Sequence, residues 1–163
     1  MRKSSSRLLG WRIKRSTLAS LSKPSSKIVA IKRPPIPAMV ITETWCGDAA
    51  QILPVVHKIA ELNPKITMKI VFRDENEALM NEFLTNGGKA IPIVIFLDLQ
   101  DKVLARWGSR PSVATQMVAE EKAKNGKLTP EFKEDLQRWY NQDKGATIVD
   151  DFIAIMQSIL TEK

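Results

Sequence analysis

The residue best suited to carry chemistry is Cys46, the only cysteine among 163 residues. An apolar, β-branched run from Met39 to Thr42 predicts a buried strand before it, and an apolar pattern of helical period begins after it at Ala49. The thiol therefore falls at a helix N-terminus, where free N–H groups and the helix dipole favour a thiolate. We expect a reactive nucleophile. A partly buried cysteine without chemistry is the alternative.

Acidic neighbours complicate this picture. Asp48, in the first helical turn, matches the helix dipole, but a negative charge near the sulfur opposes thiolate formation. Glu43 adds a second acid, and no lysine or arginine is adjacent in sequence. These effects oppose one another, and the sequence does not rank them. His57 lies about 16 Å farther along the helix. We therefore interpret it as a surface histidine rather than the base for the thiol.

Composition restricts the class of protein. A single cysteine excludes an intramolecular disulfide, and with one histidine it argues against a Cys/His metal site. We expect no metal and no cofactor. No apolar run reaches the roughly 18 residues that a membrane span needs, so we expect no span and a soluble, cytoplasmic protein.

The net charge of +7 is unevenly distributed. Residues 1–37 hold ten basic residues and no acid, which leaves 15 basic against 18 acidic residues, a net −3, in 38–163. The overall charge therefore does not favour nucleic-acid binding by the domain. We predict a basic, Ser/Arg-rich leader (1–37) and one domain (38–163). The leader is interpreted as poorly ordered or peripherally docked, as an organelle-targeting segment, or as a basic arm that contacts membrane or nucleic acid.

The body alternates strands and helices before a hairpin, which is an α/β layout with a mixed sheet. After the first strand we expect a helix over 47–62 (kinked at Pro54), a strand over 66–72, a helix over 77–85 and strands over 91–97 and 103–107. Three further helices follow, over 112–124, about 130–142 and 146–160. The last two form a C-terminal helical extension, about 126–163.

A second segment is expected beside the thiol. Pro92 begins a predicted strand, where proline has no N–H to donate to a neighbouring strand. A cis Ile91-Pro92 bond there would be a specific structural feature. Such a turn would place the backbone of Ile91 beside Cys46 and offer an edge to extended peptide. Trp45 would flank the sulfur as an apolar platform.

Trp45-Cys46-Gly47-Asp48, the helix proline Pro54, and Gly87 with Ile91-Pro92 ahead of a strand-turn-strand resemble the thioredoxin family. The resemblance covers roughly residues 38–125. It implies a three-layer α/β/α fold with a mixed central sheet, to which this chain adds C-terminal helices and the basic extension. It also implies Cys46 as nucleophile, Pro92 as the cis proline, and substrate contacts at Trp45, Gly47, Asp48, Ile91 and Pro92.

The departures from the family pattern restrict the chemistry. Reductases of the family carry a second cysteine where this chain has Ala49, and many members carry a buried acid where it has Val40. No resolving thiol exists, so release of a mixed disulfide needs an outside thiol such as glutathione. We therefore expect at most monothiol exchange with a protein disulfide or thiol, in cell redox homeostasis. The alternative is a non-catalytic module that binds protein through the same groove.

Two polar segments each have two interpretations. Arg73-Asp74-Glu75-Asn76 is interpreted as a polar helix cap or as part of a ligand site at the sheet edge. Arg110, in Trp107-Gly108-Ser109-Arg110-Pro111, is interpreted as a structural loop residue or as a group that faces substrate.

Overall fold

The structure, a computed structural model, describes residues 35–161, and the predictions for residues 1–34 lie outside this range. Strands and helices alternate first, and helices follow. The elements are β1 (Ile36–Thr42), α3 (Gly47–Leu62), β2 (Ile66–Phe72), α4 (Glu77–Asn81), β3 (Ile93–Leu97), β4 (Val103–Gly108), α5 (Ser112–Asn125), α6 (Pro130–Asp143) and α7 (Ala146–Thr161).

The described strands form one mixed sheet in the order β2-β1-β3-β4. β1 pairs with β2 in parallel and with β3 antiparallel, and β3 pairs with β4 antiparallel. The helix between β1 and β2 is the crossover that a parallel pair requires. The predicted mixed sheet is confirmed.

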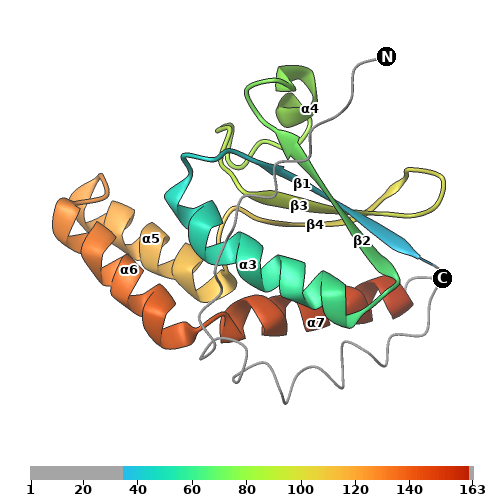
Figure 1. The fold of residues 1–163 in the computed structure, drawn as a ribbon. Helices are drawn as coiled ribbons and strands as arrows, with labels where there is room; N and C mark the ends of the chain where they lie inside the picture. The colour runs from blue at the N-terminus through green and yellow to red at the C-terminus, as the bar shows by residue number, and fades with distance from the viewer. Residues whose placement is uncertain (1–34, 162–163) are drawn as a thin grey trace.

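Helices cover both faces of this sheet (Figure 1). α3, α5, α6 and α7 pack on one face, where alternate residues of β1 and β3, such as Val40 and Phe96, are fully buried. α4 covers the other face, where Met80 packs against Ile41. The alternation places successive strand side chains on opposite faces. The α/β fold with helices on both sides is therefore confirmed.

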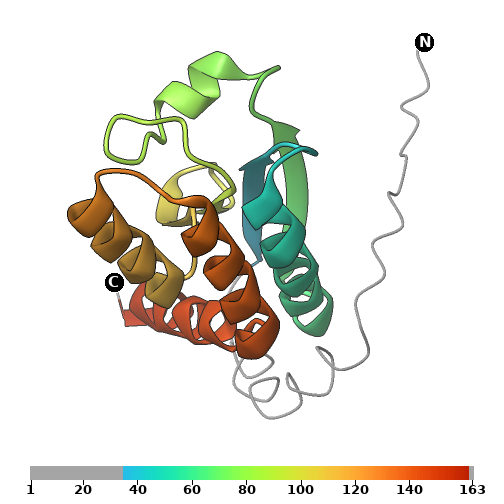
Figure 2. The same cartoon turned by 90° about the vertical axis from the view of Figure 1, so that its left-hand side faces the viewer.

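The last two helices belong to the main core. Phe152 of α7 makes edge-to-face contacts with Phe96 of β3 and Trp107 of β4, with ring centroids 5.3 Å apart in both pairs. Leu136 and Tyr140 of α6 are buried in the same cluster. Seen from the side, α5 and α6 lie next to one another, and α7 runs beneath the sheet (Figure 2). The C-terminal helices therefore complete one face of the sheet.

The first strand begins earlier than predicted. β1 starts at Ile36, whose N–H donates to the Lys65 carbonyl, and it includes Pro37. Pairing with β3 begins only at Ala38, one residue later. The missing N–H of Pro37 therefore falls at the start of the strand, where proline is tolerated. The proline-rich sequence favours an extended connector there, whereas the structure shows strand from Ile36.

The predicted helix over 77–85 is shorter in the structure, and the third strand begins later than predicted. α4 ends at Asn81, and β3 begins at Ile93. Thr85 and Gly88 exchange two backbone hydrogen bonds of 2.9 Å around Asn86 and Gly87, which both have positive φ. Such an Asn-Gly pair is typical of a tight two-residue turn, so Gly87 closes a turn and not a helix.

Candidate functional site

Cys46 is the residue at which the strand-to-helix turn ends. It is the N-cap of α3, with φ −77° and ψ 115°, and its carbonyl accepts the first helical hydrogen bond from Ala50 at 3.2 Å. The sulfur is half-buried and makes no cap hydrogen bond to the helix. α3 then continues through Pro54 to Leu62. The predicted position of the thiol at a helix N-terminus is confirmed.

The Ile91-Pro92 segment lies against this sulfur. The Cys46 Sγ donates to the Ile91 carbonyl oxygen at 3.4 Å, across 45 positions of sequence. The Ile91-Pro92 peptide bond is cis, and both residues are buried at the entrance to β3. The expected meeting of these two distant segments is thus observed. The hydrogen bond exists only while the thiol is protonated, because a thiolate has no proton to donate.

Trp45 lies beside the thiol at the surface. Trp45 is 61% exposed, the largest value among the large apolar residues in the part of the chain that the structure describes. The guanidinium of Arg73 lies 4.8 Å from the centre of its ring, a cation–π distance. The Arg73 Nη1 also donates to the Lys89 carbonyl at 3.2 Å. Arg73 therefore links the Trp45 loop to the segment that leads to Pro92.

The loop after β2 contacts the loop after β1 through a second pair. The backbone N–H of Asp74 donates to the Glu43 carboxylate at 2.8 Å. Asn76, the N-cap of α4, makes no side-chain cap hydrogen bond to that helix and donates instead to the Phe72 carbonyl. Residues 73–76 therefore hold the loop next to Cys46, rather than serving mainly as a side-chain helix cap.

The carboxylate of Asp48 has a partner on each oxygen. The Arg110 Nη2 lies 2.7 Å from Oδ2, and the Tyr140 hydroxyl donates to Oδ1 at 3.0 Å. Sequence reasoning placed Tyr140 only in the core, because nothing in its neighbourhood signals a partner 92 residues away. The loop motif Trp107-Gly108-Ser109-Arg110-Pro111 marks Arg110 as a candidate in the sequence, and the structure pairs its side chain with Asp48.

Two buried polar atoms near this end of the sheet have no hydrogen-bond partner among the described residues. They are the Thr42 hydroxyl oxygen, at the end of β1, and the Arg110 Nε. Thr42 is 2% exposed. Arg110 therefore engages the protein chiefly through its terminal nitrogen.

Burial is the largest cause that raises the pKa of the Tyr140 hydroxyl well above its ordinary value. The Asp48 carboxylate raises it further, through its charge and the hydrogen bond, and Arg110 opposes this. Burial and the Asp48 carboxylate both favour the neutral phenol over the phenolate. Tyr140 is therefore a fixed hydrogen-bond donor to Asp48 at any physiological pH.

The remaining predicted residues are placed as follows. Gly47 is exposed, and a β-carbon there would meet nothing within 4 Å, so the backbone after the thiol is open to solvent. His57 lies on the exposed side of α3, where it is 3.6 Å from Glu61. The prediction of a surface histidine is therefore confirmed. The substrate contacts assigned to Trp45, Gly47, Asp48, Ile91 and Pro92 stay predictions.

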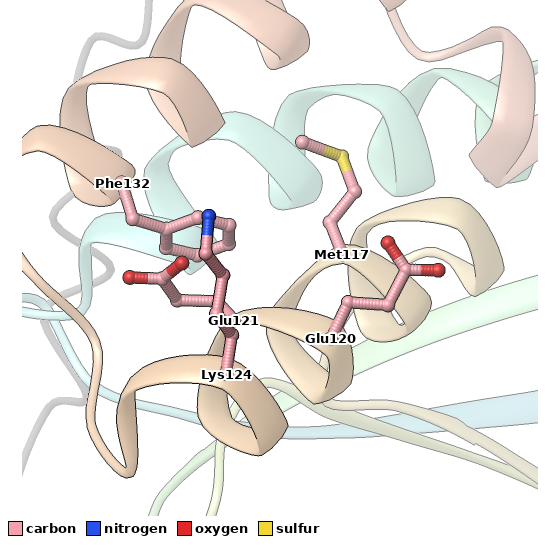
Figure 3. A pocket seen from close by; sticks show the side chains of 5 residues that line it. All are labelled: Met117, Glu120, Glu121, Lys124 and Phe132. Atoms are coloured by element: carbon pink, nitrogen blue, oxygen red, sulfur yellow. The ribbon is translucent and has the colours of Figure 1, made fainter.

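An open pocket of about 260 Å³ lies between α5 and α6 (Figure 3). It is lined by Met117, Glu120, Glu121, Lys124 and Phe132. Glu121 accepts a hydrogen bond from the Thr129 hydroxyl at 2.8 Å, so it supports the residue that caps α6. The thiol does not line this pocket.

Within residues 35–161, no three His, Cys, Asp or Glu side chains are grouped so that they could hold a metal ion. No helix in that same part of the chain is long and apolar enough to cross a bilayer.

Comparison with known proteins identifies the family. The sequence profile described as thioredoxin matches residues 6–124, which begins well before the region that carried the resemblance. A protein of unknown function from Pseudomonas aeruginosa has a similar structure, with 20% identity, a TM-score of 0.64 and coverage of 88% of this chain and 81% of that chain. An HIV epitope scaffold is similar, with 21% identity, a TM-score of 0.63 and the same coverage. No curated protein matches. These structures share the fold, and the profile covers most of the sequence: the chain belongs to the thioredoxin family.

Proposed function

We propose that this protein acts in thiol redox chemistry through Cys46 as a single reacting thiol. One observation carries the proposal: the half-buried sulfur is the N-cap of α3 and touches the carbonyl that precedes Pro92. Thiolates are stabilised at helix N-termini, where backbone N–H groups point outward. The exposed Trp45 ring and the open backbone at Gly47 leave one side of the sulfur accessible to a partner.

The chemistry follows from the single cysteine. The Cys46 thiolate attacks one sulfur of a disulfide and forms a mixed disulfide, while the other sulfur leaves as a thiolate. No second cysteine exists to displace the product. An outside thiol such as glutathione attacks the partner's sulfur, takes over the disulfide and releases Cys46 as a thiolate. No electrons are gained or lost overall, and one partner thiol replaces another.

This activity needs no cofactor, and it needs a compartment in which the thiol stays reduced. The cytoplasm is such a compartment, and thiol-keeping systems there would supply the outside thiol. A protein disulfide, a small thiol, or both would be the substrate. An organelle location remains the alternative for the case in which residues 1–37 act as a targeting leader.

A binding module without thiol chemistry is the second candidate, and one contact favours it. The thiol proton is already directed at the Ile91 carbonyl, while Trp45 offers an exposed apolar face next to it. A partner segment could then lie across Trp45 and Pro92 without any reaction at sulfur.

The experiment that separates the two uses the full chain and glutathione disulfide. We expect intact-mass spectrometry to show one glutathione on the folded protein, its removal by reduced glutathione, and no adduct on Cys46→Ser. We expect the folded protein to react faster than the urea-unfolded chain, which has the same thiol without the site. Slower reaction of the folded protein would contradict the redox role and favour the binding module.

A further inference from the structure

Three elements converge on the carboxylate that is nearest to the thiol in sequence. Asp48 is in the first turn of α3, Arg110 is in the loop between β4 and α5, and Tyr140 is in α6. The Asp48 and Arg110 side chains are only 15% and 24% exposed, and Tyr140 is 7% exposed. An ion pair with this little solvent is screened far less than a surface pair. We call these three residues the Asp48 brace.

The loop that carries Arg110 is held at both ends. The Asp151 carboxylate of α7 accepts hydrogen bonds from the Trp107 indole N–H and the Ser112 backbone N–H, both at 2.9 Å. Gly108 packs so close to the Pro92 carbonyl that a β-carbon would lie 2.3 Å from the oxygen. The Thr115 hydroxyl also donates to the Arg110 carbonyl. The backbone that carries Arg110 is therefore held in place by contacts at both ends of the loop.

Several charged side chains lie in the loops around the thiol, and each has a partner. The Glu43 carboxylate accepts a hydrogen bond from the Asp74 N–H. The Arg73 guanidinium lies over the Trp45 ring and pairs with the Asp74 carboxylate. The Asp48 carboxylate is balanced by Arg110, and the Tyr140 hydroxyl adds no charge because burial and Asp48 raise its pKa. In the sequence alone, Asp48 is a negative charge two residues from the sulfur with no basic neighbour to offset it.

We propose that Arg110 and Tyr140 are positioning residues for Cys46: they hold Asp48 as a fixed, charge-balanced pair, so that its negative charge does not oppose formation of the thiolate. The inference deepens the proposed function, since it concerns the reactivity of the same sulfur. It also gives the C-terminal helices a role at the site, because α6 supplies Tyr140 and α7 holds the Arg110 loop.

Charge balance predicts an order of reactivity that a purely structural role does not. Asp48→Asn leaves the Arg110 charge unbalanced and favours the thiolate. Arg110→Gln leaves the Asp48 charge unbalanced and opposes it. The double variant removes both charges and returns the site to neutrality. If the brace only supported the fold, both single variants would change reactivity in the same direction.

The test measures the second-order rate of Cys46 alkylation by iodoacetamide, a neutral reagent, for the full chain and the three variants from about pH 6 to pH 10. At neutral pH we expect Asp48→Asn to react fastest, the wild type and the double variant to agree within about twofold, and Arg110→Gln to be about three- to tenfold slower. The midpoint of the rate profile should move in opposite directions in the two single variants. Circular dichroism and thermal unfolding check that each variant is folded.

A wild-type rate in folded Arg110→Gln, or a double variant as slow as Arg110→Gln, would overturn the proposal. If Arg110→Gln does not fold, the double variant decides: a rate within about twofold of wild type supports the brace, and a clearly faster rate, as expected for removal of an uncompensated carboxylate, refutes it. Alkylation reports on the sulfur whether or not glutathione is exchanged. If a glutathione adduct forms but the alkylation rates do not follow the expected order, only the brace is refuted. If the rates follow the expected order but no adduct forms, only the exchange function is refuted.

Discussion

The backbone at Gly108 lies against the carbonyl oxygen of Pro92, so that a β-carbon at Gly108 would approach that oxygen to 2.3 Å. This contact joins the end of β4 to the turn beside Cys46. The same loop delivers Arg110 to Asp48 at the start of α3. One short segment after the hairpin therefore touches both halves of the candidate site.

We predict that Gly108→Ala destabilises the protein by about 2–4 kcal/mol. The new methyl group would meet backbone, which cannot move aside as a side chain can, and φ at this position is +123°, a region that alanine rarely adopts. Urea unfolding measures the change. Gly47→Ala is the matched control, because nothing lies within 4 Å of its β-carbon position, and it should stay within about 1 kcal/mol of wild type.

Gly145, in the turn between α6 and α7, and Gly126, which ends α5, offer a second pair of glycine variants. Gly145 and Gly126 both have positive φ, +82° and +71°, but a β-carbon at Gly145 would lie 2.6 Å from a methyl group of Val55 in α3, while the space at Gly126 is open. We expect Gly126→Ala to cost about 1 kcal/mol from backbone conformation alone. Gly145→Ala should cost about 1–3 kcal/mol more in urea unfolding. Equal costs in the two variants would show that Gly145 is not closely packed against Val55.

Tyr140 is the only tyrosine, so tyrosinate absorbance in the ultraviolet reports on this residue alone. Its pKa in the folded state is raised above the ordinary value of about 10 by burial and then by Asp48. We expect no tyrosinate signal in the folded protein near pH 10, where the urea-unfolded chain is half ionised. Ionisation of Tyr140 in the folded protein near pH 10 would contradict a buried hydrogen bond from its hydroxyl to Asp48.

The same shift fixes the direction of a stability change. Because the folded-state pKa of Tyr140 is the higher one, its stabilising contribution is fully present below about pH 10 and is lost as the pH rises above it. We expect the free energy of unfolding to decline above pH 10 in the wild type, and to decline less in Tyr140→Phe, which has no proton to lose. Urea titrations at pH 9 and at about pH 11 measure both slopes.

We expect Trp45 to contribute more to partner binding than to the stability of the fold. We predict that Trp45→Ala changes the unfolding free energy by less than about 1 kcal/mol, since the ring is 61% exposed and its described partner is the Arg73 guanidinium. Exchange with a disulfide-containing peptide should nevertheless slow several-fold. Leu99→Ala is the control, because Leu99 is 59% exposed but lies past the opposite end of β3. Equal effects of the two variants would deny Trp45 a role in recognition.

The sequence by itself determined the frame of the molecule. Alternation of apolar strands and amphipathic helices predicted the mixed α/β sheet, and the strand-to-helix step at Cys46 placed the thiol at a helix N-terminus. These features depend on local periodicity and on the geometry of consecutive residues, which a linear pattern contains. The single cysteine, which limits the proposed exchange to one thiol, is likewise a property of the sequence alone.

Tertiary structure decided the surroundings of the thiol. The strand-initial Pro92 predicts the Ile91 backbone beside Cys46, where the structure places a hydrogen bond, but the sequence does not predict the partners of Asp48. Arg110 and Tyr140 lie 62 and 92 positions from Asp48, and neither their spacing nor their type marks them as its partners. Electrostatic balance at a site depends on distances through space, which loop closure and helix packing set. The charge that sequence reasoning counted against the thiolate is for this reason balanced only in the folded chain.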